Sequence, residues 1–321
     1  MRRVVALLAA VLAATALGAC GDGGAEPGVP EGATVVLDFT PNAVHSGIYA
    51  ASARGYYREA GLDLTIEEPG ASTDAPRLLQ AGRADFAILD IEDLGIARER
   101  GLDVVGVAPI VSAPLASVIS RADGPVARPR DLVGRTAGVT GLPSDDAVLD
   151  SEVAGDGGNP AEVRRVTIGF NAVASLAAER VSAVTGFRNA EAVALRRSGV
   201  AVRVFAVEDF GAPRFPELIL CTSASTLKSN PDLVAEVARA TARGYRFVLS
   251  HPRRGLGYLL AASPGLDRAG QAAQLRALIP ALRPVGRFST ARLREWAAWA
   301  LAHGIIERPL AVAAAFRPQI R

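Results

Sequence analysis

The sequence predicts an α/β protein in which strands alternate with helices around two mainly parallel sheets. Short apolar runs recur between longer amphipathic stretches, at the spacing typical of strand–helix–strand units. Half of the residues are hydrophobic and only 21% are charged, so the composition favours a large packed core over disorder. The 321 residues are enough for two domains of ordinary size.

The first set of elements extends from residue 34 to residue 111. The expected strands are 34–39, 62–66, 86–89 and 104–111, and the expected helices are 45–60, 74–81 and 90–100. Gly61, Gly82 and Gly101 directly follow these helices, as expected of residues that end a helix in the left-handed conformation. This alternation predicts one sheet of parallel strands with helices on its faces.

A second set of elements repeats the alternation. Its strands are expected at 136–139, 163–168, 183–185 and 202–207, and its helices at 144–154, 172–179 and 190–197. One more strand is expected after Glu217, and the remainder of the chain is expected to be helical. Because the second sheet already has helices of its own, we expect this tail to cover the first sheet. Lobe 1 is then discontinuous, at 33–121 and 215–321, and lobe 2 is inserted at 122–214.

The N-terminus has the pattern of an export signal. Met1-Arg2-Arg3 is followed by an uncharged run that is shorter than the roughly 20 apolar residues needed to span a bilayer. Leu17-Gly18-Ala19-Cys20 resembles a bacterial lipobox, so we expect a signal peptide at 1–19 and lipidation of Cys20. Residues 20–32 are then a flexible spacer. The protein is expected to be lipid-anchored at the cell membrane, on its extracytoplasmic face; the alternative is an ordinary secreted protein.

Charge and cysteine content argue against several classes of function. The formal charge is +2, from 35 basic and 33 acidic residues, which gives no support to nucleic-acid binding. Two cysteines and three scattered histidines form no metal-ligand pattern, so neither a metal nor a cofactor is expected. Cys221 lies in an apolar run and is expected in the core. Lys228 is the only lysine, which restricts Schiff-base chemistry.

Several short motifs between residues 35 and 233 carry a family resemblance. Among them are LDFTPN at 37–42, HSGIY at 45–49, AGRADF at 81–86, GLPSD at 141–145, GFNAV at 169–173 and AVTGFRNAE at 183–191. In these motifs the chain resembles the NMT1/THI5-like family of thiamine-pyrimidine-precursor-binding proteins. The resemblance implies a periplasmic-binding-protein-like (type II) fold, with two lobes, a hinge and a ligand cleft. It also implies a monomeric solute-binding protein that delivers its ligand to the permease subunits of an ABC importer.

The candidate ligand contacts follow predicted strands, where open α/β sheets bind their ligands. They are Asp38, Phe39, Asn42, His45, Tyr49, Asp90, Glu92, Gly141, Ser144, Asp145, Phe187, Arg188, Asn189 and Glu191. Phe39 and Phe187 are expected to face a ligand ring from opposite lobes, and the polar side chains are expected to bond its edge. Many family members carry tryptophan where Phe39 stands and another aromatic residue where Arg188 stands.

Most of these candidates also have a purely structural interpretation. Phe39 and Tyr49 are compatible with a place in the hydrophobic core. Asp90, Ser144 and Asn189 stand where the N-cap of a helix is expected. Glu191 follows Arg188 by three residues, a spacing at which the two side chains can pair.

Carboxylates dominate the candidate positions, and Arg188 is the one obvious cation. The acidic members are Asp38, Asp90, Glu92, Asp145 and Glu191. Because buried like charges are costly, this set favours a neutral or amino-bearing heterocycle over phosphate, sulfonate or nitrate. We therefore expect a hydroxymethylpyrimidine or aminopyrimidine precursor of thiamine as the ligand. The alternatives are another aromatic solute, such as a flavin, and an enzyme that forms the pyrimidine itself.

Overall fold

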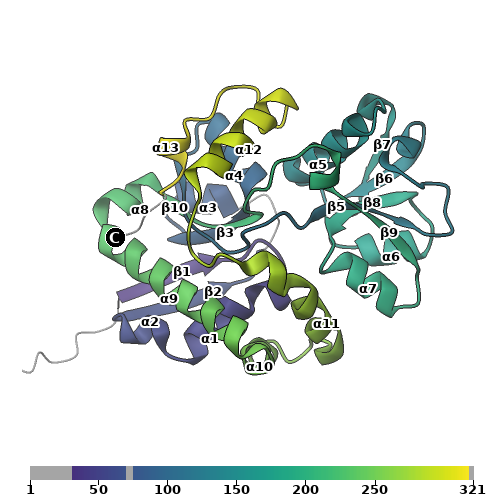
Figure 1. Cartoon of the computed structure of the whole chain (residues 1–321). Helices are drawn as coiled ribbons and strands as arrows, with labels where there is room; N and C mark the ends of the chain where they lie inside the picture. The colour runs from purple at the N-terminus through teal and green to yellow at the C-terminus, as the bar shows by residue number, and fades with distance from the viewer. Residues whose placement is uncertain (1–30, 70–74, 318–321) are drawn as a thin grey trace, which may run out of the picture.

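The structure, a computed structural model, describes residues 31–69 and 75–317. The expected signal peptide and the expected lipidation site Cys20 lie outside these residues. Within the described ranges, no helix combines the length and the apolar character needed to cross a membrane. Figure 1 shows two lobes, each with a sheet at its centre and helices around it.

The first sheet has five strands in the order β2-β1-β3-β10-β4. They are Leu62–Glu67 (β2), Glu31–Val36 (β1), Phe86–Asp90 (β3), Leu218–Ser223 (β10) and Val104–Pro109 (β4). β1 pairs in parallel with β2 and β3, whereas β10 runs antiparallel between β3 and β4. Because β1 begins at Glu31, the expected spacer that ends at Gly32 is two residues too long.

The second sheet repeats this topology in the order β7-β6-β8-β5-β9. Its strands are Arg164–Thr167 (β7), Thr136–Val139 (β6), Ala183–Phe187 (β8), Ala116–Arg121 (β5) and Val202–Ala206 (β9). β6 is parallel to β7 and β8, and β5 is antiparallel to β8 and β9. In each sheet four strands share one direction and one strand is reversed. Both sheets are therefore mixed, with two parallel and two antiparallel pairings each, where mainly parallel sheets were expected.

The strand β5 corrects the expected lobe boundary. The apolar pattern predicts no strand at 116–121 and places these residues in lobe 1, but they pair with β8 and β9 of the second sheet. Ser117 and Ser120 interrupt the apolar pattern, yet both are fully buried. Their hydroxyls donate to Gly186 O and Val126 O, each at 2.8 Å. These internal hydrogen bonds make a polar-looking segment suitable for the middle of a sheet.

Helices cover both faces of the first sheet (Figure 1). From the first part of the chain come Ala43–His45 (η1), Ser46–Ala53 (α1), Tyr56–Glu59 (α2), Ala75–Gln80 (α3) and Ile91–Glu99 (α4). From the tail come Ala224–Ser229 (α8), Pro231–Ser250 (α9), Pro252–Ala262 (α10), Arg268–Leu278 (α11), Ile279–Leu282 (η5), Thr290–Ala302 (α12) and Val312–Ala315 (α13). α1, α9 and α10 pack on one face, and α3, α4, α12 and α13 on the other. The expected single helix at 45–60 is divided at Gly55, whose φ is +73°.

The second lobe has fewer helices, and two of them contact the first lobe. They are Pro143–Gly155 (α5), Ala172–Ala177 (α6) and Glu191–Arg197 (α7), with short 3-10 turns at Pro129–Leu132 (η2), Pro160–Glu162 (η3) and Val207–Phe210 (η4). Arg197 of α7 pairs with Asp267 at the start of α11, with 3.2 Å between Nη2 and Oδ2. Ser144 Oγ of α5 lies 3.4 Å from Asp93 Oδ2 of α4.

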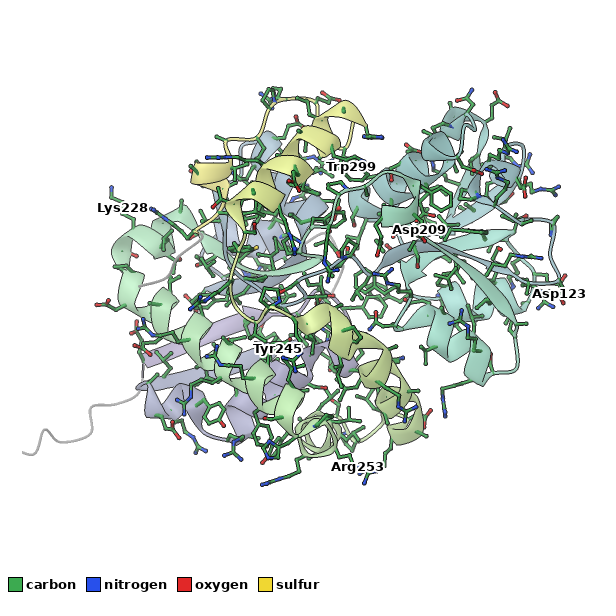
Figure 2. The ribbon with its side chains drawn as sticks, in the orientation of Figure 1. Asp123, Asp209, Lys228, Tyr245, Arg253 and Trp299 are labelled. Carbon is green, nitrogen blue, oxygen red and sulfur yellow. The ribbon has the colours of Figure 1, made fainter. Side chains whose placement is uncertain are left out.

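Close packing of α1 on α9 fixes the segment that follows β1. A Cβ on Gly244 would lie only 2.0 Å from Gly47 O, so the two helices approach where both lack a side chain. The next residue, Tyr245, lies where α9 crosses the first sheet (Figure 2), and its hydroxyl donates to Val44 O at 2.8 Å. This bond anchors η1, and with it the loop that leads from β1 into η1.

Candidate ligand-binding site

A cavity lies between the two lobes, at the ends of β1, β3, β6 and β8. It is lined by Asp38, Phe39, Asn42, Val44, Asp90, Glu92, Ala116, Ser117, Thr140, Leu142, Ser144, Asp145, Val148, Gly169, Phe170, Ala172, Thr185, Gly186, Phe187, Ala190, Glu191 and Glu217. Nine of the fourteen candidates from the sequence are therefore in its wall. Their roles in binding a ligand remain predictions.

On the wall from lobe 1, Asp38 is oriented by a buried histidine. His45 is completely buried, and its Nδ1 accepts a hydrogen bond from the backbone N–H of Asn42 at 3.2 Å. The proton of the neutral ring is therefore on Nε2, which donates to Asp38 Oδ1 at 2.9 Å. The Asn42 side chain accepts from Val44 N at 2.9 Å and caps η1. His45 thus lies behind the wall, where it positions Asp38 rather than lining the cavity.

Asp90 and Glu92 follow β3 and present carboxyl groups that the protein leaves largely unpaired. Asp90 stands at the N-cap position of α4, as its structural interpretation expects, but its side chain makes no capping bond. Glu92 has no exposed surface; its Oε1 lies 3.4 Å from Trp296 Nε1. Glu92 Oε2 has no hydrogen-bond partner among the described residues. Burial and then neighbouring carboxylates raise the pKa of both groups well above the ordinary range.

Glu217 is a wall residue that is not among the candidates predicted from the sequence. It precedes β10, and its Oε2 accepts from the backbone N–H groups of Leu115 and Ala116, the latter at 2.8 Å. These two residues lead into β5, so Glu217 joins the two chain segments that pass between the lobes. Burial raises the pKa of Glu217 to about 7. A single glutamate outside any motif gives no signal of this position in the sequence.

On the wall from lobe 2, two carboxylates are held by backbone donors. Asp145 Oδ2 accepts from Thr140 N at 2.6 Å, and Glu191 Oε2 accepts from Phe187 N at 2.7 Å. Gly186 makes room for Glu191, because a Cβ there would lie 3.0 Å from Glu191 Oε2. Burial raises the pKa of both carboxyl groups, and the backbone hydrogen bonds oppose the rise.

A third aromatic side chain joins the expected pair, Phe39 and Phe187, in the wall of the cavity. Phe39 contacts Phe170, which precedes α6, with ring centroids 4.1 Å apart and planes inclined by 63°. This edge-to-face contact joins the two lobes. Phe187 also lines the cavity, but the ring that touches Phe39 belongs to Phe170, which is 40% exposed. Phe39 is in neither hydrophobic core of lobe 1, so its interpretation as a core residue is wrong.

Four further candidates lie outside the cavity wall. Tyr49 packs against the core beneath α9 and α10. Gly141 forms the turn between β6 and α5 with a φ of +101°. Arg188 pairs with Glu208, with 2.7 Å between Nη2 and Oε1, and bonds Pro114 O, so it does not pair with Glu191. Asn189 is buried, and its amide has no hydrogen-bond partner in the described part of the chain.

The electrostatic character of the cavity is acidic. Six of the residues in the wall described above carry a carboxyl group, and none is lysine, arginine or histidine. The acidic ones are Asp38, Asp90, Glu92, Asp145, Glu191 and Glu217. An anion that entered this space would lose its hydration and meet six carboxyl groups, with no basic side chain in the described wall to balance its charge. The wall is suited to hydrogen-bond donors, to cations and to the face of an aromatic ring.

Comparison with known proteins assigns the family. The family model described as "NMT1/THI5 like" matches residues 42–255, more than half of the chain. The chain belongs to the NMT1/THI5-like family. Within this family, a formylaminopyrimidine-binding protein from Halalkalibacterium halodurans is 32% identical over 291 residues, which are 88% of each chain. A 4-amino-5-hydroxymethyl-2-methylpyrimidine phosphate synthase from Legionella pneumophila is 25% identical over 236 residues, covering 73% of this chain and 74% of its own.

The fold of this NMT1/THI5-like protein is similar to that of solved structures over most of its length. The alkanesulfonate-binding protein SsuA from Xanthomonas axonopodis pv. citri superposes with a TM-score of 0.71 over 90% of this chain and 98% of its own. The two sequences are 17% identical, so the similarity is one of fold alone. The expected periplasmic-binding-protein-like architecture is confirmed.

Proposed function

We propose that this protein is the solute-binding component of an ABC importer and that it binds a small amino-bearing pyrimidine between its lobes. The observation that carries the proposal is the cavity itself, which combines aromatic rings with six carboxyl groups and has no basic side chain in its described wall. The named ligand of the H. halodurans relative, a formylaminopyrimidine, belongs to the same chemical class. Two α/β lobes joined by two chain crossings favour a role in which the protein closes around a solute.

Glu191 is the group best placed to recognise an aminopyrimidine edge. A 4-aminopyrimidine presents an N–H donor beside a ring-nitrogen acceptor. A carboxyl group with a raised pKa matches both, since one oxygen accepts from the amino group and the protonated oxygen donates to the ring nitrogen. Glu191 Oε2 accepts from the Phe187 backbone with one lone pair, so its second lone pair can accept from the amino group while Oε1 carries the proton. Phe187 itself is the last residue of β8 and supplies an adjacent ring face.

A binding role is favoured over catalysis by the position of the one lysine. A synthase that holds an aldehyde cofactor as a Schiff base needs a lysine in its cleft. Lys228 is exposed on α8, at the outer end of lobe 1 and on the side away from lobe 2 (Figure 2). It is absent from the cavity wall.

A ligand screen by thermal melting tests the proposed function. A ligand that binds only the folded protein stabilises it by about 2.7 kcal/mol at about 100 times its Kd. We expect a rise in melting temperature with aminopyrimidines, including the formylated compound, and no rise with nitrate or alkanesulfonates. Riboflavin is the competitor that represents a larger aromatic solute. A shift with an anion alone, or with riboflavin alone, would contradict an aminopyrimidine ligand.

We also propose that the protein is lipid-anchored through Cys20 outside the cytoplasm. The first described strand, β1, begins at Glu31, so Cys20 precedes it by only a short stretch of sequence. Cys20→Ala is expected to release the protein into the soluble or secreted fraction without lowering its melting temperature. The matched control is Cys221→Ala, which alters the buried cysteine of β10 and should leave membrane attachment intact. Retention of the Cys20→Ala protein on membranes after a high-salt wash would count against the lipid anchor.

A further inference from the structure

The cavity has a second polar end that an aminopyrimidine edge does not occupy. Glu191 and Asp145 come from lobe 2, whereas Asp90 and Glu92 come from the start of α4 in lobe 1. Glu217 stands at the lobe junction, and its charge acts on both Asp90 and Glu92. A ring recognised by Glu191 leaves Glu92 Oε2 and the Asp90 carboxyl group, on the other lobe, available to another part of the ligand.

At this second polar end of the cavity, carboxyl oxygens without hydrogen-bond donors indicate a site for a ligand group rather than a structural role. Glu92 is fully buried and belongs to the cavity wall, yet its Oε2 has no partner in the described part of the chain. A buried carboxyl oxygen of this kind is costly unless a donor reaches it. Asp90 is 7% exposed and could cap α4, but its side chain makes no capping bond. Backbone donors hold Asp145, Glu191 and Glu217, whereas among the described residues no backbone N–H bonds the Asp90 side chain as a cap and no donor reaches Glu92 Oε2.

We propose that Asp90 and Glu92 form a subsite for a protonated primary amine carried by the ligand on a short arm of its pyrimidine ring. This proposal rests on the proposed function and specifies its ligand as a diamine, with one amino group on the ring and one on the arm. An alkylammonium group has three N–H donors and a positive charge, which suits two carboxylates better than a hydroxyl or a formamide does. A hydroxyl offers one donor and no charge, and a formamide nitrogen is neutral.

Charge balance supports the assignment. The charged groups near Asp90 and Glu92 are Asp38 with its partner His45, Asp93, and Glu217 with Arg188 beyond it. Because burial raises the pKa values of Asp90 and Glu92, the empty site favours the protonated form of both carboxyl groups. An ammonium group favours the ionised carboxylates, so binding of the amine releases protons to the solvent. A neutral analogue leaves those protons in place.

The test compares three probes that differ only in the arm of the ring. They are 4-amino-5-aminomethyl-2-methylpyrimidine, its N-formyl derivative and 4-amino-5-hydroxymethyl-2-methylpyrimidine. Calorimetric titration of the wild-type protein at pH 7 is expected to give at least about tenfold tighter binding for the amine, the effect of one charge-assisted hydrogen bond. Titrations in buffers of different ionisation enthalpy should show proton release with the amine and none with the hydroxymethyl compound.

Substitutions test whether the preference for the amine over the hydroxymethyl compound arises from Asp90 and Glu92. Glu92→Gln and Asp90→Asn keep the side-chain shape and should each reduce the ratio of amine to hydroxymethyl affinity, together with the proton release. Glu191→Gln should weaken all three probes, because it acts on the ring that they share. Glu59→Gln, on α2 and paired with Arg243, is the control and should leave the ratio unchanged. Thermal melts verify that each variant is folded.

The outcomes separate this inference from the proposed function. Equal affinities for the amine and the hydroxymethyl compound, or tighter binding of the formamide, overturn the amine subsite while an aminopyrimidine ligand stands. Failure of all three probes to bind the wild-type protein overturns the proposed function itself. Both readouts on the wild-type protein remain decisive even where a variant does not fold.

Discussion

Replacing Phe39 by alanine is expected to weaken ligand binding by about tenfold or more, because ring stacking and apolar burial are lost together. Phe39 follows β1 and meets Phe170 across the cavity, with 4.1 Å between ring centroids. Since Phe39 belongs to neither core of lobe 1, its loss should change the melting temperature little. Phe170→Ala should act in the same direction, because the exposed ring covers the cavity from lobe 2. Calorimetric titration and thermal melts on the same samples measure both effects.

Val166→Ala provides the control for removing an exposed apolar side chain from lobe 2. Val166 is 47% exposed on β7 and is not part of the cavity wall. Its substitution should leave affinity unchanged. If Phe39→Ala melts far below the wild-type protein and still binds normally, the ring supports the fold and not the ligand. In the double variant of Phe39 and Phe170, a loss smaller than the sum of the two single losses would show that the rings act together.

The second large effect is expected at Glu217. Glu217→Ala removes the one carboxylate that accepts from both Leu115 and Ala116, and so leaves two buried backbone N–H groups without an acceptor. Each unsatisfied group costs about 1–3 kcal/mol, which predicts a loss of about 2–4 kcal/mol when water from the cavity reaches part of the site. Glu217→Gln retains an oxygen that can accept both bonds, and should preserve most of the stability. Urea unfolding at constant pH measures the difference.

The wild-type protein and the Glu217→Gln variant should differ in how their stability depends on pH. The pKa of Glu217 rises from 4.5 to about 7 on folding, so the folded protein holds more protons than the unfolded chain between these values. The contribution of Glu217 to stability is therefore fully present below about pH 4.5 and is lost as the pH rises through about 7. Glu217→Gln does not titrate. The wild-type protein should lose stability relative to this variant over that range, and a constant difference would exclude a titrating Glu217.

Much of the fold follows from the sequence because strands and helices differ in their apolar period. The glycines after 45–60, 74–81 and 90–100 adopt the expected left-handed conformation, at Gly61, Gly82 and Gly101. β5 has no such signal, since Ser117 and Ser120 are buried through hydrogen bonds formed only in the folded sheet. The lobe boundary depends on that strand, so the predicted boundary is misplaced as well.

Only part of the cavity wall can be predicted from the sequence, for a geometrical reason. Strand ends indicate which loops reach the cavity, and this identifies Asp38, Asp90 and Glu191. They do not indicate whether a side chain lines the wall or stands behind it, as His45 does. Phe170 and Glu217 contribute through contacts with chain segments more than one hundred residues away. Those contacts have no local pattern in the sequence.

The order of strands also constrains how a growing chain can assemble. β3 and β4 of the first sheet do not pair with each other, because β10 lies between them. All five strands of the second sheet lie within residues 116–206, so that lobe is complete before β10 has been synthesised. Synthesis of lobe 1 therefore begins before that of lobe 2 and ends after it. The sheet of lobe 1 lacks the strand between β3 and β4 until residues 218–223 insert. Until then the edges of β3 and β4 are exposed to pairing with other chains, which makes nascent lobe 1 the part most in need of protection from aggregation.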